Sequence, residues 1–387
     1  MKNLSLFTTN ISENRRKYST VFIYLMINAL FIVKYGEKYN IVLLVSYFVA
    51  IAGLSFFFIK INLKDIFYKS LFWIGVISFF IFSIFLNYKV DGNSLNVDRW
   101  SAMEVGIKAI LNGQYPYNIP DHMGWESSNL PMLIVLGMPF YLLFGSVGYL
   151  QSFIFLFFCY LIFKIFNNYK QRSVVLILLF LSPSYLWEVY VKSDLFSNFV
   201  LICGFTYLIW RRFLSEKRMK SELVSFFTAL LFLTRLSAII PLTILLFKKF
   251  YDLSVNEKLR FIVVFVLSVS VILYIFFHNV PNIDVLMRHN PLMIQSAKQP
   301  LLLSFSYIVL ALILSFKVKS LFEIMYWSGI LLFVCVLVPF IMYFVEFGYT
   351  EMIVNSSFDI SFFNMGMPFI LISIVLGIFK NNYKESK

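Results

Sequence analysis

Apolar runs follow one another along the whole chain and leave little room for a soluble fold. Hydrophobic residues make up 60% of the 387 positions and charged residues only 14%, whereas a soluble domain carries about 25% charged residues. A helix needs roughly 20 apolar residues to span a bilayer core. The runs lie at 20–33, 41–59, 70–87, 131–144, 149–166, 173–187, 195–210, 221–233, 236–247, 261–277, 303–316, 321–344 and 361–379. We therefore expect an all-α, polytopic integral membrane protein.

Basic residues indicate which runs cross the membrane, because Lys and Arg collect in cytoplasmic loops. If every run except 131–144 crosses, and the N-terminus lies inside, most of the 33 Lys and Arg residues face the cytoplasm. If 131–144 also crosses, every later loop changes sides and the bias reverses. We therefore expect about twelve spanning helices and two cytoplasmic termini. Segment 131–144 is then expected to form a short helix at the outer interface. The net charge of +13 reflects the basic cytoplasmic loops and does not indicate nucleic-acid binding.

Arg235 lies near the middle of the apolar segment 221–247. A single crossing would place its charge at the bilayer centre, which is costly. It would also put the two flanking basic loops on opposite faces. A hairpin of 221–233 and 236–247 with Arg235 at its outer tip avoids both problems.

We expect one integral-membrane domain over residues 1–387. Its outer face carries the polar segments 88–130, 278–302 and 345–360, together with most of the acids. Three cysteines, Cys159, Cys203 and Cys335, lie inside separate apolar runs. Their spacing fits neither a disulfide framework nor a metal site, so we interpret them as small buried hydrophobes.

The outer segment 88–130 holds the richest chemistry. After Asp98, the residues Met103, Ile107 and Ile110 recur at helical spacing, so Asp98 is expected near the N-terminal end of a short amphipathic helix. The helix dipole favours a charged carboxylate there. Such a carboxylate can accept a proton from an attacking hydroxyl. Alternatively, Asp98 only caps the helix.

A longer pattern extends this loop. Asp98 is followed by an aromatic residue, Trp100, then by Gly-Gln-Tyr-Pro-Tyr at 113–117, and then by an apolar segment from Pro131 to Gly145. This pattern resembles the first outer loop of the GT-C superfamily of glycosyltransferases. It is most similar to the polyprenyl-phosphate-mannose-dependent enzymes of glycosyltransferase family 87.

The resemblance implies a membrane enzyme that transfers a sugar, a mannose-like hexose, from a polyprenyl phosphate to a hydroxyl of a glycan or glycolipid acceptor. Asp98 matches the family acid and would act as general base in an inverting displacement. The site would face the extracytoplasmic side of a bacterial cytoplasmic membrane. No cofactor or metal is implied, although a divalent cation held by the outer acids is an alternative.

The departing phosphate needs cations to hold its charge. The candidates are Arg235, Arg288, His289 and Lys192, and Arg suits bidentate phosphate contact. Arg235 could instead form a structural pair with Asp194 or Glu188, and Arg288 and His289 could be a solvated pair.

Further side chains could bind the acceptor or the sugar. Asp194 and Glu188 are candidates for acceptor hydroxyls, and Tyr115, Tyr117 and Trp125 are candidates for stacking on sugar rings. The alternatives are ordinary loop acids and interfacial aromatic anchors.

Two other functions remain open: an envelope-polysaccharide polymerase, and a transporter or flippase of lipid-linked glycans. A transporter is expected to show inverted repeats and broken helices near the midplane. Neither is evident in the sequence.

Overall fold

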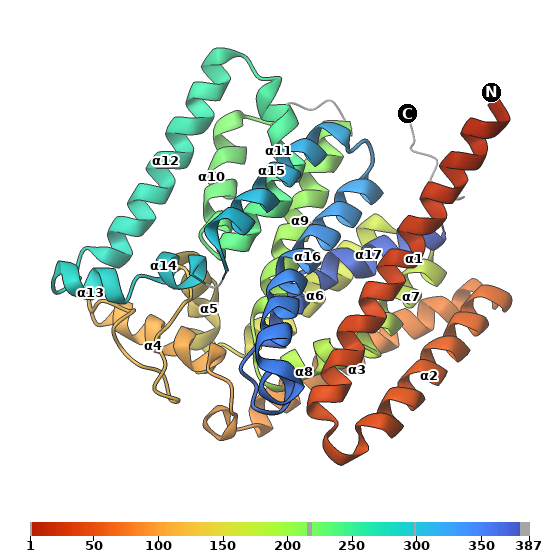
Figure 1. Cartoon of the computed structure of the whole chain (residues 1–387), viewed down its shortest axis with the longest axis horizontal. Coiled ribbons are helices and arrows are strands. Elements are labelled where there is room, and N and C mark those ends of the chain that lie inside the picture. Colours follow the sequence, from red (N-terminus) through yellow and green to blue (C-terminus); the bar gives the residue numbers. More distant parts are fainter. Residues whose placement is uncertain (1, 215–218, 298, 380–387) are drawn as a thin grey trace. The chain divides into compact units, whose positions relative to one another are not determined.

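The computed structural model describes residues 2–214, 219–297 and 299–379, and all regular structure within them is helical (Figure 1). Each apolar run lies on a helix, so the all-α prediction is confirmed. The chain divides into two compact units built from separated segments. Unit 1 comprises 1–81, 156–188 and 320–387, and unit 2 comprises 82–155 and 189–319.

Five helical segments of the described chain are long and apolar enough to cross a membrane, and the number reaches eight if each of three bent pairs is one span. The five are Asn14–Tyr35, Glu37–Phe58, Asp65–Lys89, Val255–Phe277 and Leu321–Val354. The protein therefore has the helices of an integral membrane protein. The expected count of about twelve spans stays a prediction.

Broken helices are present, although the sequence did not reveal them. α5 (Pro131–Phe144) and α6 (Tyr149–Ile165) are bent by 111°, and α7 (Tyr169–Phe180) and α8 (Pro183–Tyr190) by 64°. The first break follows Gly145, which ends α5 with a φ of 75°, a conformation that favours glycine. Segment 131–144 is thus a separate short helix, as predicted.

Unit 1 is organised around α17 (Met367–Ile378), whose side chains are buried along most of its length. It contacts both α1 (Lys2–Tyr35) and α16 (Leu321–Tyr349). α1 turns back through η1 (Glu37–Tyr39) into α2 (Asn40–Lys60) (Figure 1). The unit also contains α7, most of α8, the first part of α3 (Asp65–Lys89), the later part of α6, η4 (Thr350–Val354) and η5 (Ile360–Met365).

Buried polar contacts fix the break between α7 and α8 in unit 1. Ser182 donates its hydroxyl to Asn28 Oδ1 at 2.8 Å, and the backbone N–H of Ser184 donates to the same oxygen at 3.2 Å. Asn364 donates to the Ser184 carbonyl at 3.1 Å. The break frees backbone groups, and these side chains satisfy them.

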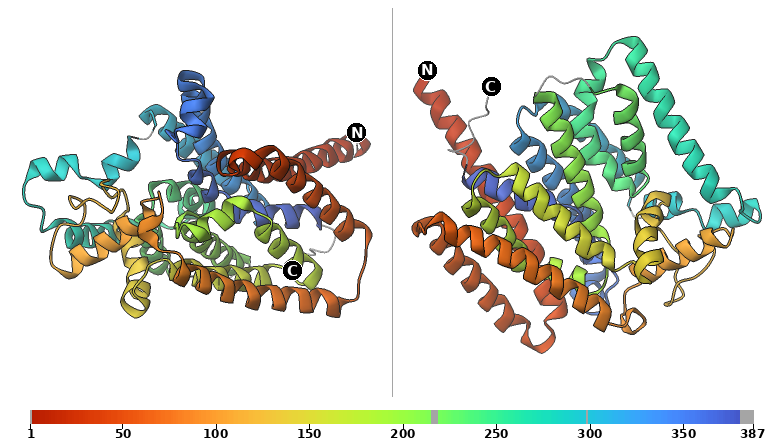
Figure 2. Two further views of the ribbon diagram at one scale, coloured as in Figure 1. Left: turned by 90° about the horizontal axis from the view of Figure 1, so that it is seen from below. Right: turned by 180° about the vertical axis from the view of Figure 1, so that it is seen from behind.

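Unit 2 contains the segment 88–130. α4 (Arg99–Leu111) packs against α5, and Gly137 allows close approach because a Cβ there would overlap the Met103 sulfur. α9 (Leu195–Leu214) contacts α11 (Ile239–Tyr251). α12 (Val255–Phe277) packs against α10 (Ser221–Phe232), and the two lie side by side in Figure 1 and in the right panel of Figure 2. The unit also contains η2 (Gly92–Ser94), α13 (Ile283–Arg288), α14 (Pro291–Ser296) and α15 (Leu301–Lys317).

The hairpin predicted around Arg235 is confirmed. α10 ends at Phe232, Arg235 lies in the turn, and η3 (Leu236–Ala238) leads into α11. The two arms have 12 and 13 residues. At 1.5 Å per residue each is roughly 20 Å long, shorter than a bilayer core of about 30 Å. An arm of this length cannot span the core alone as a straight helix.

Candidate functional site

Asp98 occupies the N-cap position of α4, but its side chain makes no capping hydrogen bond. Its carbonyl accepts the Ala102 N–H and the Ser101 hydroxyl, each at 2.8 Å. The carboxylate is partly buried and has no hydrogen-bond or ion-pair partner among the described residues. The capping alternative is therefore wrong for this side chain, and the carboxylate is free to contact another molecule.

The other acids of the outer loop are engaged. Asp91 Oδ1 accepts the Asn93 N–H at 3.0 Å, and Asp121 Oδ1 accepts two backbone N–H groups of its own turn. Glu104 Oε1 accepts the Val147 N–H at 3.2 Å, and Glu126 lies 2.9 Å from His289. The Asp98 carboxylate differs from them because it makes no such hydrogen bond or ion pair with the described residues.

His122 holds the backbone around Asp98 in place. One ring nitrogen lies 2.6 Å from the Ser101 hydroxyl and the other 3.0 Å from the Leu95 carbonyl. The ring also contacts Trp100, with centroids 5.2 Å apart. His122 thus joins the residues before Asp98 to the first turn of α4. Its sequence spacing from those partners carries no signal, so sequence reasoning missed it.

Lys192 lies in the turn before α9 and is 8% exposed. Its φ of 56° is in the left-handed region, which is uncommon outside glycine and costs free energy. The ammonium lies 6.0 Å from the centre of the Trp100 ring. It makes no hydrogen bond or ion pair with the described residues. Burial lowers the pKa of Lys192, and the charges of Glu104 and Asp91 partly oppose that effect.

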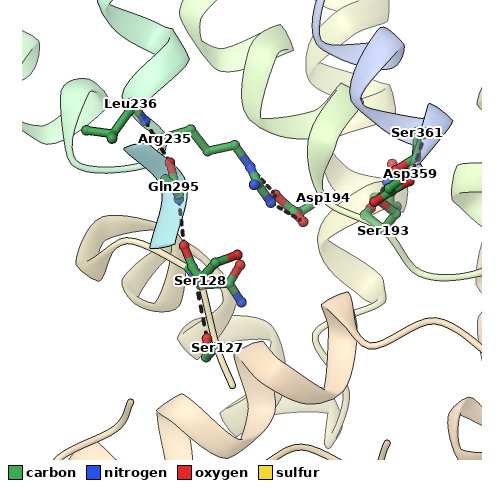
Figure 3. Close-up of polar contacts among 11 residues, drawn as sticks. Ser127, Ser128, Ser193, Asp194, Arg235, Leu236, Gln295, Asp359 and Ser361 are labelled. Atoms are coloured by element: carbon green, nitrogen blue, oxygen red, sulfur yellow. Dashed lines mark hydrogen bonds and ion pairs between the residues drawn. The ribbon is translucent and has the colours of Figure 1, made fainter. Parts of the chain in front are cut away.

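Two residues further on, Asp194 forms a buried ion pair with Arg235 (Figure 3). Arg235 Nη2 donates to both carboxylate oxygens, at 2.7 and 2.9 Å, and Nε donates to Oδ2 at 3.1 Å. The two side chains are only 4% and 2% exposed. The structural pair that we considered as an alternative for Arg235 is present, so most of its donor capacity is already directed to a carboxylate.

A glutamine connects this pair to the start of α5. Gln295 of α14 accepts the Leu236 N–H at 3.0 Å and donates to the Ser128 carbonyl at 2.6 Å (Figure 3). The Met132 N–H also donates to the Leu233 carbonyl at 3.1 Å. The turn that carries Arg235 is therefore tied to the segment before α5. Gln295 was not a candidate, because nothing in its sequence context suggests two backbone partners.

The candidate aromatic residues differ in accessibility. Tyr115 and Tyr117 are 2% and 0% exposed, within an apolar cluster that includes Phe276. The Tyr115 hydroxyl donates to the His289 carbonyl at 3.0 Å, and burial raises the pKa of Tyr115 to about 12. Their ring faces are covered, so stacking on a sugar would require the loop to move. Trp125, in contrast, is 61% exposed.

The remaining candidates are separated by their surroundings. Arg288 is exposed at the end of α13. His289 lies 2.9 Å from Glu126, in a contact that lacks hydrogen-bond geometry. Glu188 is fully buried in α8 and belongs to unit 1, whereas every other candidate belongs to unit 2.

No group of three His, Cys, Asp or Glu side chains suited to a metal ion occurs among the residues searched in the described chain. Cys159 and Cys203 are buried, as predicted, and Cys335 is half-buried. The site is thus a set of acids, cations and amides carried by unit 2. Comparisons with protein-family models, curated proteins and solved structures found no match to this chain.

Proposed function

We propose that this protein is a membrane glycosyltransferase that uses a lipid-linked sugar, with Asp98 as general base. The unengaged carboxylate of Asp98 carries the proposal. A base must be able to reach the proton that it removes. Asp98 is held at the start of a packed helix by its backbone contacts, while its side chain is left without a partner among the described residues.

In the proposed reaction, an acceptor hydroxyl attacks the anomeric carbon of the donor sugar. Asp98 takes the hydroxyl proton as the new C–O bond forms. The bond between the anomeric carbon and the phosphate oxygen breaks, and polyprenyl phosphate leaves with that electron pair. The configuration at the anomeric carbon inverts. A phosphate leaving group needs little protonation, so one base is enough, but nearby cations must stabilise the charge.

The finer architecture is part of the same proposal. The chain would adopt a GT-C-like arrangement with about twelve crossings, in which the bilayer thins locally around the short α10 and α11. Both termini would face the cytoplasm, and α4 and α5 would lie at the outer face. The acceptor would be a glycan or glycolipid and the donor sugar a mannose-like hexose. The resemblance implies a separate short helix after the acid-bearing loop. α5 is such a helix, which supports the GT-C-like arrangement.

A transfer assay tests the proposal. The purified chain in lipid nanodiscs is incubated with polyprenyl-phosphate hexoses and membrane-extracted acceptors, and the sugar-bearing product is quantified. We expect transfer by the wild type and none by Asp98→Asn. Full transfer by a folded Asp98→Asn variant would eliminate this base.

A transporter or flippase of lipid-linked glycans is the second candidate, because the bent helix pairs are a feature of transporters. It predicts movement of a labelled lipid-linked sugar across proteoliposome membranes without a new glycosidic bond. The glycosyltransferase predicts the bond without net movement, so the two assays separate the candidates.

A further inference from the structure

Three unpartnered polar groups meet in unit 2 beside α4. Asn87, near the end of α3, is 6% exposed, and neither its Oδ1 nor its Nδ2 has a hydrogen-bond partner. Trp100 is 8% exposed, and its Nε1 is buried without a partner. The Lys192 ammonium makes no hydrogen bond or ion pair with the described residues. Buried polar groups are nearly always paired, so the two residues with buried unpaired groups beside this ammonium need an explanation.

Lys192 lies near both of the other groups. A Cβ on Gly148 would overlap Asn87 Oδ1 and would lie 2.9 Å from Lys192 Cδ. The Lys192 ammonium lies 6.0 Å from the centre of the Trp100 ring. Lys192 itself has a strained backbone, with a φ of 56°. Strain of this kind is often found at functional sites.

Helix packing explains why Asn87 faces Gly148. Ser83 of α3 donates its hydroxyl to Ser152 of α6 at 2.9 Å. Asn87 lies four residues after Ser83 on the same face of α3, and Gly148 lies four residues before Ser152, in the turn that leads into α6. Asn87 and Gly148 therefore form the next contact along the antiparallel helices. Only glycine leaves room for the amide there.

The chemistry of the site favours an anion. It offers an ammonium, an indole N–H and an amide NH₂ as donors, and it lies at the N-terminal end of the 17-residue helix α6, where the helix dipole is positive. The nearest acid, Glu104, already accepts the Val147 N–H. Burial raises the pKa of Glu104, and the Val147 N–H and the charges of Lys108 and Lys192 partly oppose that effect.

We propose that Asn87, Trp100, Lys192 and the N-terminus of α6 form a binding site for the phosphate of a polyprenyl phosphate. The assignment to the donor rests on the proposed glycosyltransferase function. The existence of an anion site does not. Lys192 would take the role for which Arg235 was the first candidate, because Asp194 already neutralises Arg235.

Calorimetry on the full chain in phosphatidylcholine nanodiscs tests the site. The probes are geranyl phosphate, the uncharged alcohol geraniol, and inorganic phosphate. We expect saturable binding of geranyl phosphate and none of geraniol. Asn87→Leu and Lys192→Gln should each weaken geranyl phosphate binding by about tenfold or more. Lys89→Gln removes an exposed charge from α3, the helix that carries Asn87. This variant should bind geranyl phosphate as the wild type does.

The remaining arms separate the possible results. Lys192→Arg keeps the charge and should retain most of the binding, which controls for misfolding of Lys192→Gln. Inorganic phosphate that binds as tightly as geranyl phosphate would overturn the lipid assignment in favour of free phosphate. If folded Asn87→Leu and Lys192→Gln bind geranyl phosphate with wild-type affinity, the site does not exist.

The test also separates this site from the proposed function. Asp98→Asn should bind geranyl phosphate normally, since its carboxylate is not part of the anion site. Absence of transfer together with Asn87-dependent binding would refute the enzyme and uphold the site. Asp98-dependent transfer together with Asn87-independent binding would refute the site and uphold the enzyme.

Discussion

Lys192 and Asp194 stand two residues apart in one turn, yet only one of them has its charge neutralised. Both oxygens of Asp194 accept hydrogen bonds from Arg235, whereas the ammonium of the buried residue Lys192 has no hydrogen-bond or ion-pair partner among the described residues. Removing an ion from water costs several kcal/mol unless another group compensates. The turn before α9 therefore combines a satisfied structural pair with a cation that is available to a ligand.

Breaking the Arg235–Asp194 pair should destabilise the protein strongly. Arg235→Gln or Asp194→Asn leaves the opposite charge buried and unpaired, at a cost of about 3–5 kcal/mol. Replacing both residues, with Arg235→Met and Asp194→Leu, should recover much of that loss. Unfolding in detergent measures all three variants, with the exposed Arg288→Gln as control. Single variants as stable as that control would contradict a structural role.

Asp98→Asn should abolish sugar transfer and leave stability unchanged. The carboxylate makes no capping bond, so the fold loses nothing, while loss of a general base typically costs a factor of about 10² to 10⁴ in rate. Transfer and thermal unfolding are measured on the same preparation. The matched variant is Asp91→Asn, which alters an acid that caps η2 and should keep its activity. A large loss of stability in Asp98→Asn would show that the side chain is structural.

Binding of geranyl phosphate should fall at high pH because Lys192 loses its proton. Burial lowers its pKa from the ordinary value of 10.5, so binding should weaken below pH 10.5 as the pH rises. Lys192→Arg should move the loss of binding to higher pH, since the guanidinium stays charged. Glu104→Gln should move the loss of binding to lower pH, because the Glu104 charge stabilises the protonated lysine. Identical profiles for all three proteins would exclude Lys192 as the titrating group.

Gln295→Leu should loosen the link between α14, the Arg235 turn and the start of α5. The substitution removes both hydrogen bonds of this side chain, which leaves backbone groups unsatisfied at about 1–3 kcal/mol each. Hydrogen exchange should increase at the Leu236 amide, because its N–H donates to Gln295. The exposed Ser296, adjacent to Gln295, provides a control in Ser296→Ala. Unchanged exchange at Leu236 would show that the Gln295 contacts do not stabilise this turn.

The expected topology places position 64 in the cytoplasm and position 125 outside. Both side chains are exposed, and two of the three natural cysteines are buried, so background labelling should be low. In intact cells an impermeant maleimide should label Trp125→Cys but not Lys64→Cys, and lysis should expose the latter. Labelling of both from the same side would contradict the charge argument.

Helical segments and their breaks could be predicted from local patterns. The runs of apolar residues, the N-terminal position of Asp98 and the turn at Arg235 all follow from composition over short windows, because helix formation and burial in lipid depend on neighbours in the chain. The sequence separated α5 from α6 but did not give the 111° angle between them. It also missed the break between α7 and α8, because 173–187 reads as one apolar run.

The chain alone determined that this protein is helical, apolar enough for a membrane, and richest in chemistry around residue 98. Tertiary structure decided which of the site's charged side chains form an ion pair and which do not. Arg235 and Asp194 are 41 positions apart, and Asn87, Gly148 and Lys192 come from three different segments. Their pairing depends on helix packing, because a side chain's electrostatic partner is set by distance in space and the burial around it.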